Sequence, residues 1–118
     1  MSIVCVYNNK TILEEYLLKS LKKQTSKYEL ILVDNRKNKY SSAANALNHG
    51  ARKAHGNYIV FAHQDIYFSQ NSWLDRTEKC LSTLNNIGIV GVAGKTTDSL
   101  VRSNIKQGII PVDVTPYK

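Results

Sequence analysis

The chain has 118 residues, and its 16 lysines and arginines against nine aspartates and glutamates give a net charge of +7. Its 42% hydrophobic and 21% charged residues are ordinary for a globular protein and argue against intrinsic disorder. The sequence has no signal peptide and no apolar stretch near the roughly 18 residues that cross a bilayer, so we expect one cytoplasmic domain over residues 1–118.

The first half of the chain predicts a strand, a helix and a second strand. Residues 2–7 and 29–34 are short, continuous apolar runs of strand length. Between them, Thr11 and Glu14 form a capping box that starts a helix ending near Gln24. The side chains expected on its inward face are Leu13, Tyr16, Leu17 and Leu21.

The second half continues the alternation of helices and strands. A helix capped by Ser41 or Ser42 has a face of small residues and is closed by Gly56. Strands are expected over residues 57–62, 88–93 and 108–114, with a helix over 71–84. The inward residues of that helix are expected to be Trp73, Leu74, Thr77, Cys80, Leu81 and Leu84. This order predicts an α/β fold, a three-layer sandwich with a mainly parallel sheet.

Polar groups follow three of the predicted strands directly. They are Tyr7-Asn8-Asn9, Asp34-Asn35 and His63-Gln64-Asp65. In open α/β sheets, ligands bind beyond the carboxyl ends of the strands. Any one of these segments is also what an ordinary polar loop contains, but their joint position favours a binding site.

Motifs of several other enzyme classes are absent from the sequence. There is no GxGxxG after the first strand, no GxxxxGK[ST] and no GxSxG, which argues against a dinucleotide site, a P-loop and a hydrolase nucleophile elbow. His49 and His55 are six apart, which does not suit a zinc site, and both are expected to be exposed. Cys5 and Cys80 are expected to be buried small hydrophobes.

The order of these elements resembles the first half of glycosyltransferase family two, which has the GT-A fold. The resemblance covers about residues 1–95. The matching positions are Tyr7 and Asn8; Ser20, Leu21, Gln24 and Thr25; Val33 and Asp34; Asn48 and Gly50; Gly56; and the position of the family's metal-binding Asp-x-Asp. Through GVAG at residues 91–94, the chain is also similar to glycosyltransferase-like proteins associated with streptomycin-type biosynthesis.

The resemblance implies a site for a nucleotide-diphosphate sugar. Asp34 would bind the base, and the other implied substrate-binding residues are Tyr7, Asn8, Asn35, Asn48 and Gln64. His63 and Asp65 stand at the Asp-x-Asp, where they would hold a divalent cation, Mn²⁺ or Mg²⁺. Because His63 replaces an oxygen ligand with imidazole, Mn²⁺ is expected to bind better than Mg²⁺.

Two departures from the family pattern leave alternatives open. Leu47 replaces an arginine, and no general base is evident in residues 96–118, where Asp98 and Asp113 are candidates only by default. The resemblance therefore implies the donor half of a truncated enzyme, whose acceptor would be a saccharide or a lipid-linked group. A second copy or a partner subunit could complete it. The alternative is a non-catalytic nucleotide-sugar-binding module.

The net charge of +7 favours anionic partners or serves solubility. The basic residues are scattered and lack clustered aromatic neighbours, so nucleic acid is not expected as a partner.

Overall fold

The structure is a computed structural model that describes residues 1–95, 101–103, 106–107 and 112–113. The chain divides into two compact units, Met1–Thr83 and Leu84–Lys118, and each is described by itself. The expectation of a single domain over residues 1–118 therefore stays a prediction.

The first unit contains the sheet and the helices that position the site. Its elements are β1 (Ser2–Tyr7), α1 (Lys10–Leu13), the π-helical segment η1 (Glu14–Leu18), α2 (Lys19–Leu21), β2 (Glu29–Asp34), α3 (Ala43–Ala51), β3 (Ile59–Phe61) and α4 (Trp73–Ser82). The second unit contains β4 (Ala93–Lys95), β5 (Val101–Ser103), β6 (Lys106–Gln107) and β7 (Val112–Asp113). No helix of the described residues is long and apolar enough to cross a membrane.

The three strands of the first unit form a parallel sheet in the order β2-β1-β3. Ser2 lies opposite Glu29 on one side and opposite Ile59 on the other. The ladder with β2 runs without a break to the pair of Tyr7 and Asp34. The parallel sheet is confirmed, and its three carboxyl ends lie along the same edge, as the ligand-binding rule for open sheets requires.

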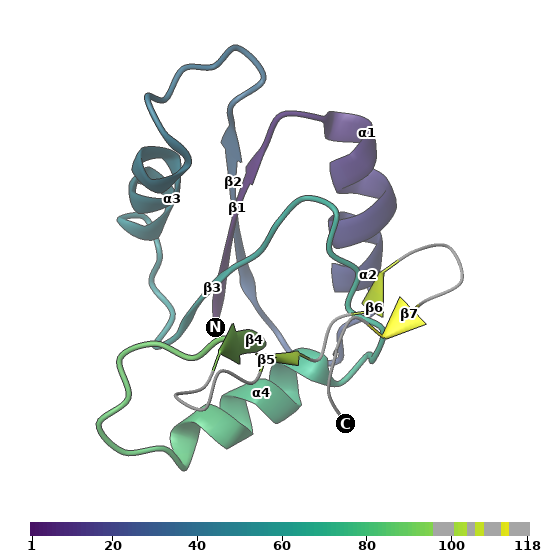
Figure 1. The fold of residues 1–118 in the computed structure, drawn as a ribbon, viewed down its shortest axis with the longest axis vertical. Helices are drawn as coiled ribbons and strands as arrows, with labels where there is room; N and C mark the ends of the chain where they lie inside the picture. Colours follow the sequence, from purple (N-terminus) through teal and green to yellow (C-terminus); the bar gives the residue numbers. More distant parts are fainter. Residues whose placement is uncertain (96–100, 104–105, 108–111, 114–118) are drawn as a thin grey trace. The chain divides into compact units, whose positions relative to one another are not determined.

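Helices cover both faces of this sheet (Figure 1). Successive side chains of a strand point to opposite faces. On one face, Val4 of β1 lies so close to α3 that a Cβ added to Gly50 would be 2.5 Å from Val4 Cγ1. On the other face, Ile3 and Cys5 belong to the buried core with residues of the first helix, among them Leu17. The expected three-layer α/β fold is confirmed.

The first helix differs from the prediction in its N-cap residue and in which side chains it buries. Asn9, not Thr11, is the N-cap, because Asn9 Oδ1 accepts a hydrogen bond from Ile12 N at 3.1 Å. Tyr16, expected inward, is 44% exposed, whereas Leu17 is fully buried. The wider π-helical turn of η1 changes the periodicity and turns Tyr16 towards solvent.

The α3 helix ends sooner than expected. It stops at Ala51, and Gly56 packs against the start of β1 and does not close the helix. His55, in the segment after α3, is exposed as predicted, but His49 on the helix is half-buried. The small-residue face is confirmed at its centre, where Ala46 and Gly50 are buried.

Several expectations for the rest of the chain were wrong or lie outside the described residues. Cys80 and Leu84 are exposed, because only the first turn of α4, with Trp73 and Leu74, packs against the core and the helix ends at Ser82. Residues 88–92 form no strand; extended pairing begins at Ala93, where β5 supplies an antiparallel partner. Of the strand expected over 108–114, Val112–Asp113 form β7 with β6, and the other residues lie outside the described part.

Candidate functional site

The carboxyl ends of β1 and β2 bring the first two predicted clusters together. Tyr7 and Asp34 are register partners in the ladder. The ladder ends on a hydrogen bond of 2.9 Å from Asn35 N to Tyr7 O. The two strands thus place the Tyr7 phenol and the Asp34 carboxylate next to each other, at the edge where ligands bind in open sheets.

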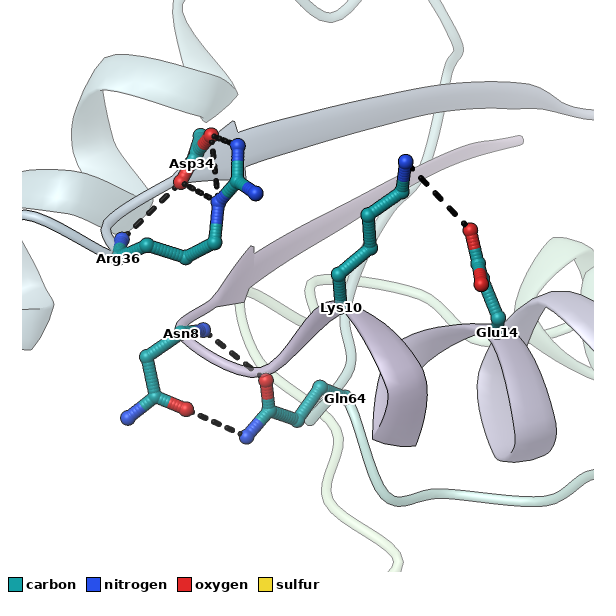
Figure 2. A network of polar contacts seen from close by, with 6 residues as sticks. All are labelled: Asn8, Lys10, Glu14, Asp34, Arg36 and Gln64. Atoms are coloured by element: carbon teal, nitrogen blue, oxygen red, sulfur yellow. Dashed lines mark hydrogen bonds and ion pairs between the residues drawn. The ribbon is translucent and has the colours of Figure 1, made fainter.

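Gln64 joins the loop after β3 to the loop after β1 (Figure 2). Its Oε1 accepts hydrogen bonds from Asn8 N and Asn9 N, both at 3.0 Å, and its Nε2 donates to Asn8 Oδ1 at 2.8 Å. The residues are 56 positions apart in the sequence. Gln64 therefore fixes the position of both loops, and three of its four hydrogen-bonding positions are already used.

The Asp34 carboxylate is paired with Arg36, a residue that the sequence analysis did not single out. Arg36 Nε lies 3.0 Å from both carboxylate oxygens, Nη2 lies 2.5 Å from Oδ2, and the Arg36 backbone N–H donates to Oδ1 at 3.0 Å. These bonds from Arg36 hold the pKa of the Asp34 carboxyl well below its usual range and raise the pKa of Arg36. The carboxylate is ionised at neutral pH, and a ligand N–H must compete with the guanidinium for it.

Tyr7 lies beside this ion pair. The Arg36 guanidinium carbon is 5.8 Å from the centre of the Tyr7 ring, within the range of a cation–π contact. Partial burial raises the pKa of Tyr7, and the negative charge of Asp34 raises it further. A hydrogen bond to the Asp34 side chain also contributes to the raised pKa of Tyr7, so the phenol is protonated at neutral pH and directed at that carboxylate.

The two remaining predicted asparagines have different positions. Asn35 Oδ1 accepts a hydrogen bond of 3.3 Å from Tyr40 N, so this side chain holds the loop between β2 and α3. Asn48 is exposed on α3, and no hydrogen bond within the described residues joins its side chain to the other predicted site residues. The structure thus places Tyr7, Asn8, Asp34, Asn35 and Gln64 at or shortly after the strand ends, whereas Asn48 lies on α3.

Comparison with known proteins identifies the family. The model of a family described as "Glycosyltransferase like family" matches residues 1–105, which include all three strand ends. The chain belongs to this glycosyltransferase-like family. No curated protein and no solved structure matches the chain. Family membership supports a glycosyltransferase-type function and the resemblance to a family-two domain.

In this glycosyltransferase-like chain the proposed metal ligands follow β3. His63 and Asp65 are both exposed and belong to a turn that a 3.3 Å hydrogen bond from Ile66 N to His63 O closes. Burial, and to a smaller degree the negative charge of Asp65, raises the pKa of the Cys5 thiol on β1 to about 11.

These two side chains are a sparse donor set. The described residues contain no group of three histidines, cysteines, aspartates or glutamates that could hold a metal ion. One imidazole and one carboxylate leave most coordination positions of Mn²⁺ or Mg²⁺ to other oxygens. A divalent cation at these two side chains would need most of its ligands from outside the described residues, such as phosphate oxygens or waters.

Proposed function

We propose that the carboxyl edge of the β2-β1-β3 sheet binds a nucleotide-diphosphate sugar for transfer to a saccharide or lipid-linked acceptor. The observation that supports this most is the convergence of Tyr7, Asp34 and Gln64 at one sheet edge in a member of a glycosyltransferase-like family. Strand ends at this edge are where open α/β sheets place ligands.

The Asp34–Arg36 pair would bind the nucleoside. An ionised carboxylate has about four acceptor positions, and Arg36 uses them through three nitrogen atoms. A base N–H would replace one of these bonds, and the released guanidinium N–H would then be available to a carbonyl or phosphate oxygen. In this proposal Asp34 and Arg36 act together, while Gln64 and Asn8 position the loops around the ligand.

Replacing Asp34 tests the proposal. Hydrogen bonds to charged groups contribute about 1.5–3 kcal/mol, so Asp34→Ala should weaken nucleoside diphosphate binding roughly 10- to 100-fold. Calorimetric titration of UDP, GDP, CDP and dTDP into both proteins measures this.

The matched control is Glu14→Ala. Glu14 is an exposed carboxylate that pairs with Lys10 at 3.8 Å, so its removal makes the same change in net charge away from the Asp34–Arg36 pair (Figure 2). Its binding constants should stay within about twofold of the wild type. Equal affinity of the wild type and Asp34→Ala for all four nucleotides would exclude Asp34 from the site.

The second test concerns the divalent cation, which would offset the charge that develops on the leaving nucleotide diphosphate. His63 and Asp65 would supply one nitrogen and one oxygen ligand. Imidazole suits Mn²⁺ better than Mg²⁺, so Mn²⁺ should strengthen UDP binding more than Mg²⁺ does. His63→Asp should reduce or reverse this preference. If UDP affinities with the two ions keep the same ratio in His63→Asp, His63 is not a ligand.

The reaction would be displacement at the anomeric carbon of the donor sugar by an acceptor hydroxyl. A positioned base must accept the proton of that hydroxyl, and we assign this role to none of the described residues. A second copy or a partner subunit could supply it. The similarity to streptomycin-type proteins stays a prediction.

A further inference from the structure

A small pocket lies beside the proposed nucleotide site, between β2, the loop that follows it and α3. Its volume is about 230 Å³. The lining residues are Leu32, Val33, Asp34, Lys39, Tyr40, His49 and Lys53. Pockets that enclose a whole drug-sized ligand usually measure 300–1,000 Å³, so this one suits a single chemical group.

The walls of the pocket are held in place by side-chain contacts. Asn35 Oδ1 accepts the hydrogen bond from Tyr40 N, and Asn38, with φ of 51°, makes the turn between them. The rings of Tyr40 and His49 lie 5.4 Å apart at 49°, which fixes the loop against α3. The pocket is therefore built by ordered residues of two elements.

The lining is positively charged. Lys39 and Lys53 approach it from the loop and from the turn after α3, and neither pairs with a carboxylate of the described residues. Lys39 Nζ lies 5.8 Å from the centre of the Tyr40 ring. The only acidic lining residue is Asp34, whose charge is balanced by Arg36 at 2.5 Å. Two positive charges remain without a counter-ion within the part of the chain that the structure describes.

We propose that this pocket binds a phosphoryl group. Two ammonium groups on different elements can donate hydrogen bonds to different oxygens of one phosphate, and such charge-assisted bonds are the strong ones. Tyr40 and His49 also line the pocket, and their side chains carry further hydrogen-bonding groups. Asp34 lines this pocket and also belongs to the proposed nucleoside site. The phosphoryl proposal requires no contact between Asp34 and a base, so either proposal can fail without the other.

Titration with inorganic phosphate and pyrophosphate tests the proposal. The variant Lys39→Gln/Lys53→Gln should bind pyrophosphate roughly tenfold more weakly or worse, because it loses both charge-assisted donors. The control Lys19→Gln/Lys22→Gln removes two exposed lysines on and next to α2. The α2 residue Leu21 packs with Ile3 and Cys5, on the face of the sheet opposite to α3. It should bind within about twofold of the wild type at the same ionic strength.

Two results would overturn the proposal. One is that the wild type binds neither phosphate nor pyrophosphate. The other is that both double variants lose affinity equally, which would indicate attraction by net charge alone. If UDP binds normally while pyrophosphate does not bind, the pocket proposal is wrong and the nucleoside site stands. If Asp34→Ala leaves UDP binding intact while pyrophosphate binding depends on Lys39 and Lys53, the nucleoside proposal is wrong and the pocket proposal stands.

Competition identifies the source of the phosphoryl group. Displacement of pyrophosphate by UDP would assign the pocket to the diphosphate of the nucleotide. Simultaneous binding of both would assign it to a second phosphorylated ligand. Both outcomes support a phosphoryl site, provided that the Lys39→Gln/Lys53→Gln variant weakens pyrophosphate binding.

Discussion

The variant Leu17→Ala is expected to lose about 2–5 kcal/mol of unfolding free energy, the usual cost of removing a fully buried leucine side chain. Leu17 is 0% exposed and belongs to the core between β1 and the first helix. Tyr16, its neighbour, is 44% exposed, so Tyr16→Ala should cost no more than about 1 kcal/mol. Urea unfolding of the two variants and the wild type measures both values.

Tyr16→Ala is the informative control, because the helical pattern of the sequence places Tyr16 and Leu17 on the same inward face. A large loss for both variants would support that pattern and contradict the exposed position of Tyr16. A small loss for Leu17→Ala would contradict the core described here. Only the combination of a large and a small effect agrees with the structure.

The difference between sequence and structure in this helix has a definite cause. Leu13, Leu17 and Leu21 are spaced by four residues, and all three are buried. In a regular α-helix, this spacing drifts around the axis, because a turn contains 3.6 residues. The wider turn of η1 keeps the leucines aligned and moves Tyr16 off the face. A π-helical turn leaves no composition signal, so the sequence could not predict it.

The strands show which signals the sequence carries well. The predicted limits of β1 and β2 agree with the structure, because parallel strands covered on both faces are continuous apolar runs. The run over residues 88–93 has the same character but forms no strand before Ala93. A strand also requires a partner with free backbone groups, and this requirement cannot be read from the run itself.

In the candidate site, too, the sequence predicts some features and not others. The neighbouring positions of Tyr7 and Asp34 follow from the rule that parallel strands share a carboxyl edge, so the sequence could predict them. The bond between Gln64 and Asn8 spans 56 residues, and its geometry depends on where the β3 loop returns. Arg36 is only two residues from Asp34, and a cation this close to a strand-end carboxylate could have been recognised as its partner.

The variant Gly56→Ala is expected to lose about 1–3 kcal/mol of unfolding free energy, the usual cost of forcing an extra carbon into a packed site. A Cβ at this position would lie 2.7 Å from Ser2 N and 2.9 Å from Met1 C. Both are backbone atoms, and Ser2 is held in the sheet by its pairing with β2 and β3. Gly88→Ala is the matched control, because no atom of the described residues lies within 4 Å of the added carbon.

The same substitution should change the pH dependence of stability. Gly56 N donates to Ser2 Oγ at 2.8 Å, and Ser2 Oγ donates to Glu29 Oε2 at 2.5 Å. The backbone N–H of His55, followed by the Ser2 hydroxyl and the His55 ring, lowers the pKa of Glu29 from 4.5 to about 2. A carboxyl group whose pKa is lowered by folding stabilises the fold at pH values above its unfolded-state pKa. This contribution disappears as the pH falls through the folded-state pKa.

Because the added Cβ would also lie 2.6 Å from Ser2 Oγ, Gly56→Ala should displace the hydroxyl from Glu29 and return part of the pKa shift. The wild type loses the full contribution of Glu29 between pH 4.5 and about pH 2, whereas the variant has less to lose. As the pH falls from 4.5 to about 2, the difference in unfolding free energy between the wild type and Gly56→Ala should therefore narrow. Thermal unfolding at several pH values measures this difference. A gap that stays constant with pH would mean that steric overlap alone destabilises the variant, and wild-type stability of Gly56→Ala would contradict the close approach to β1.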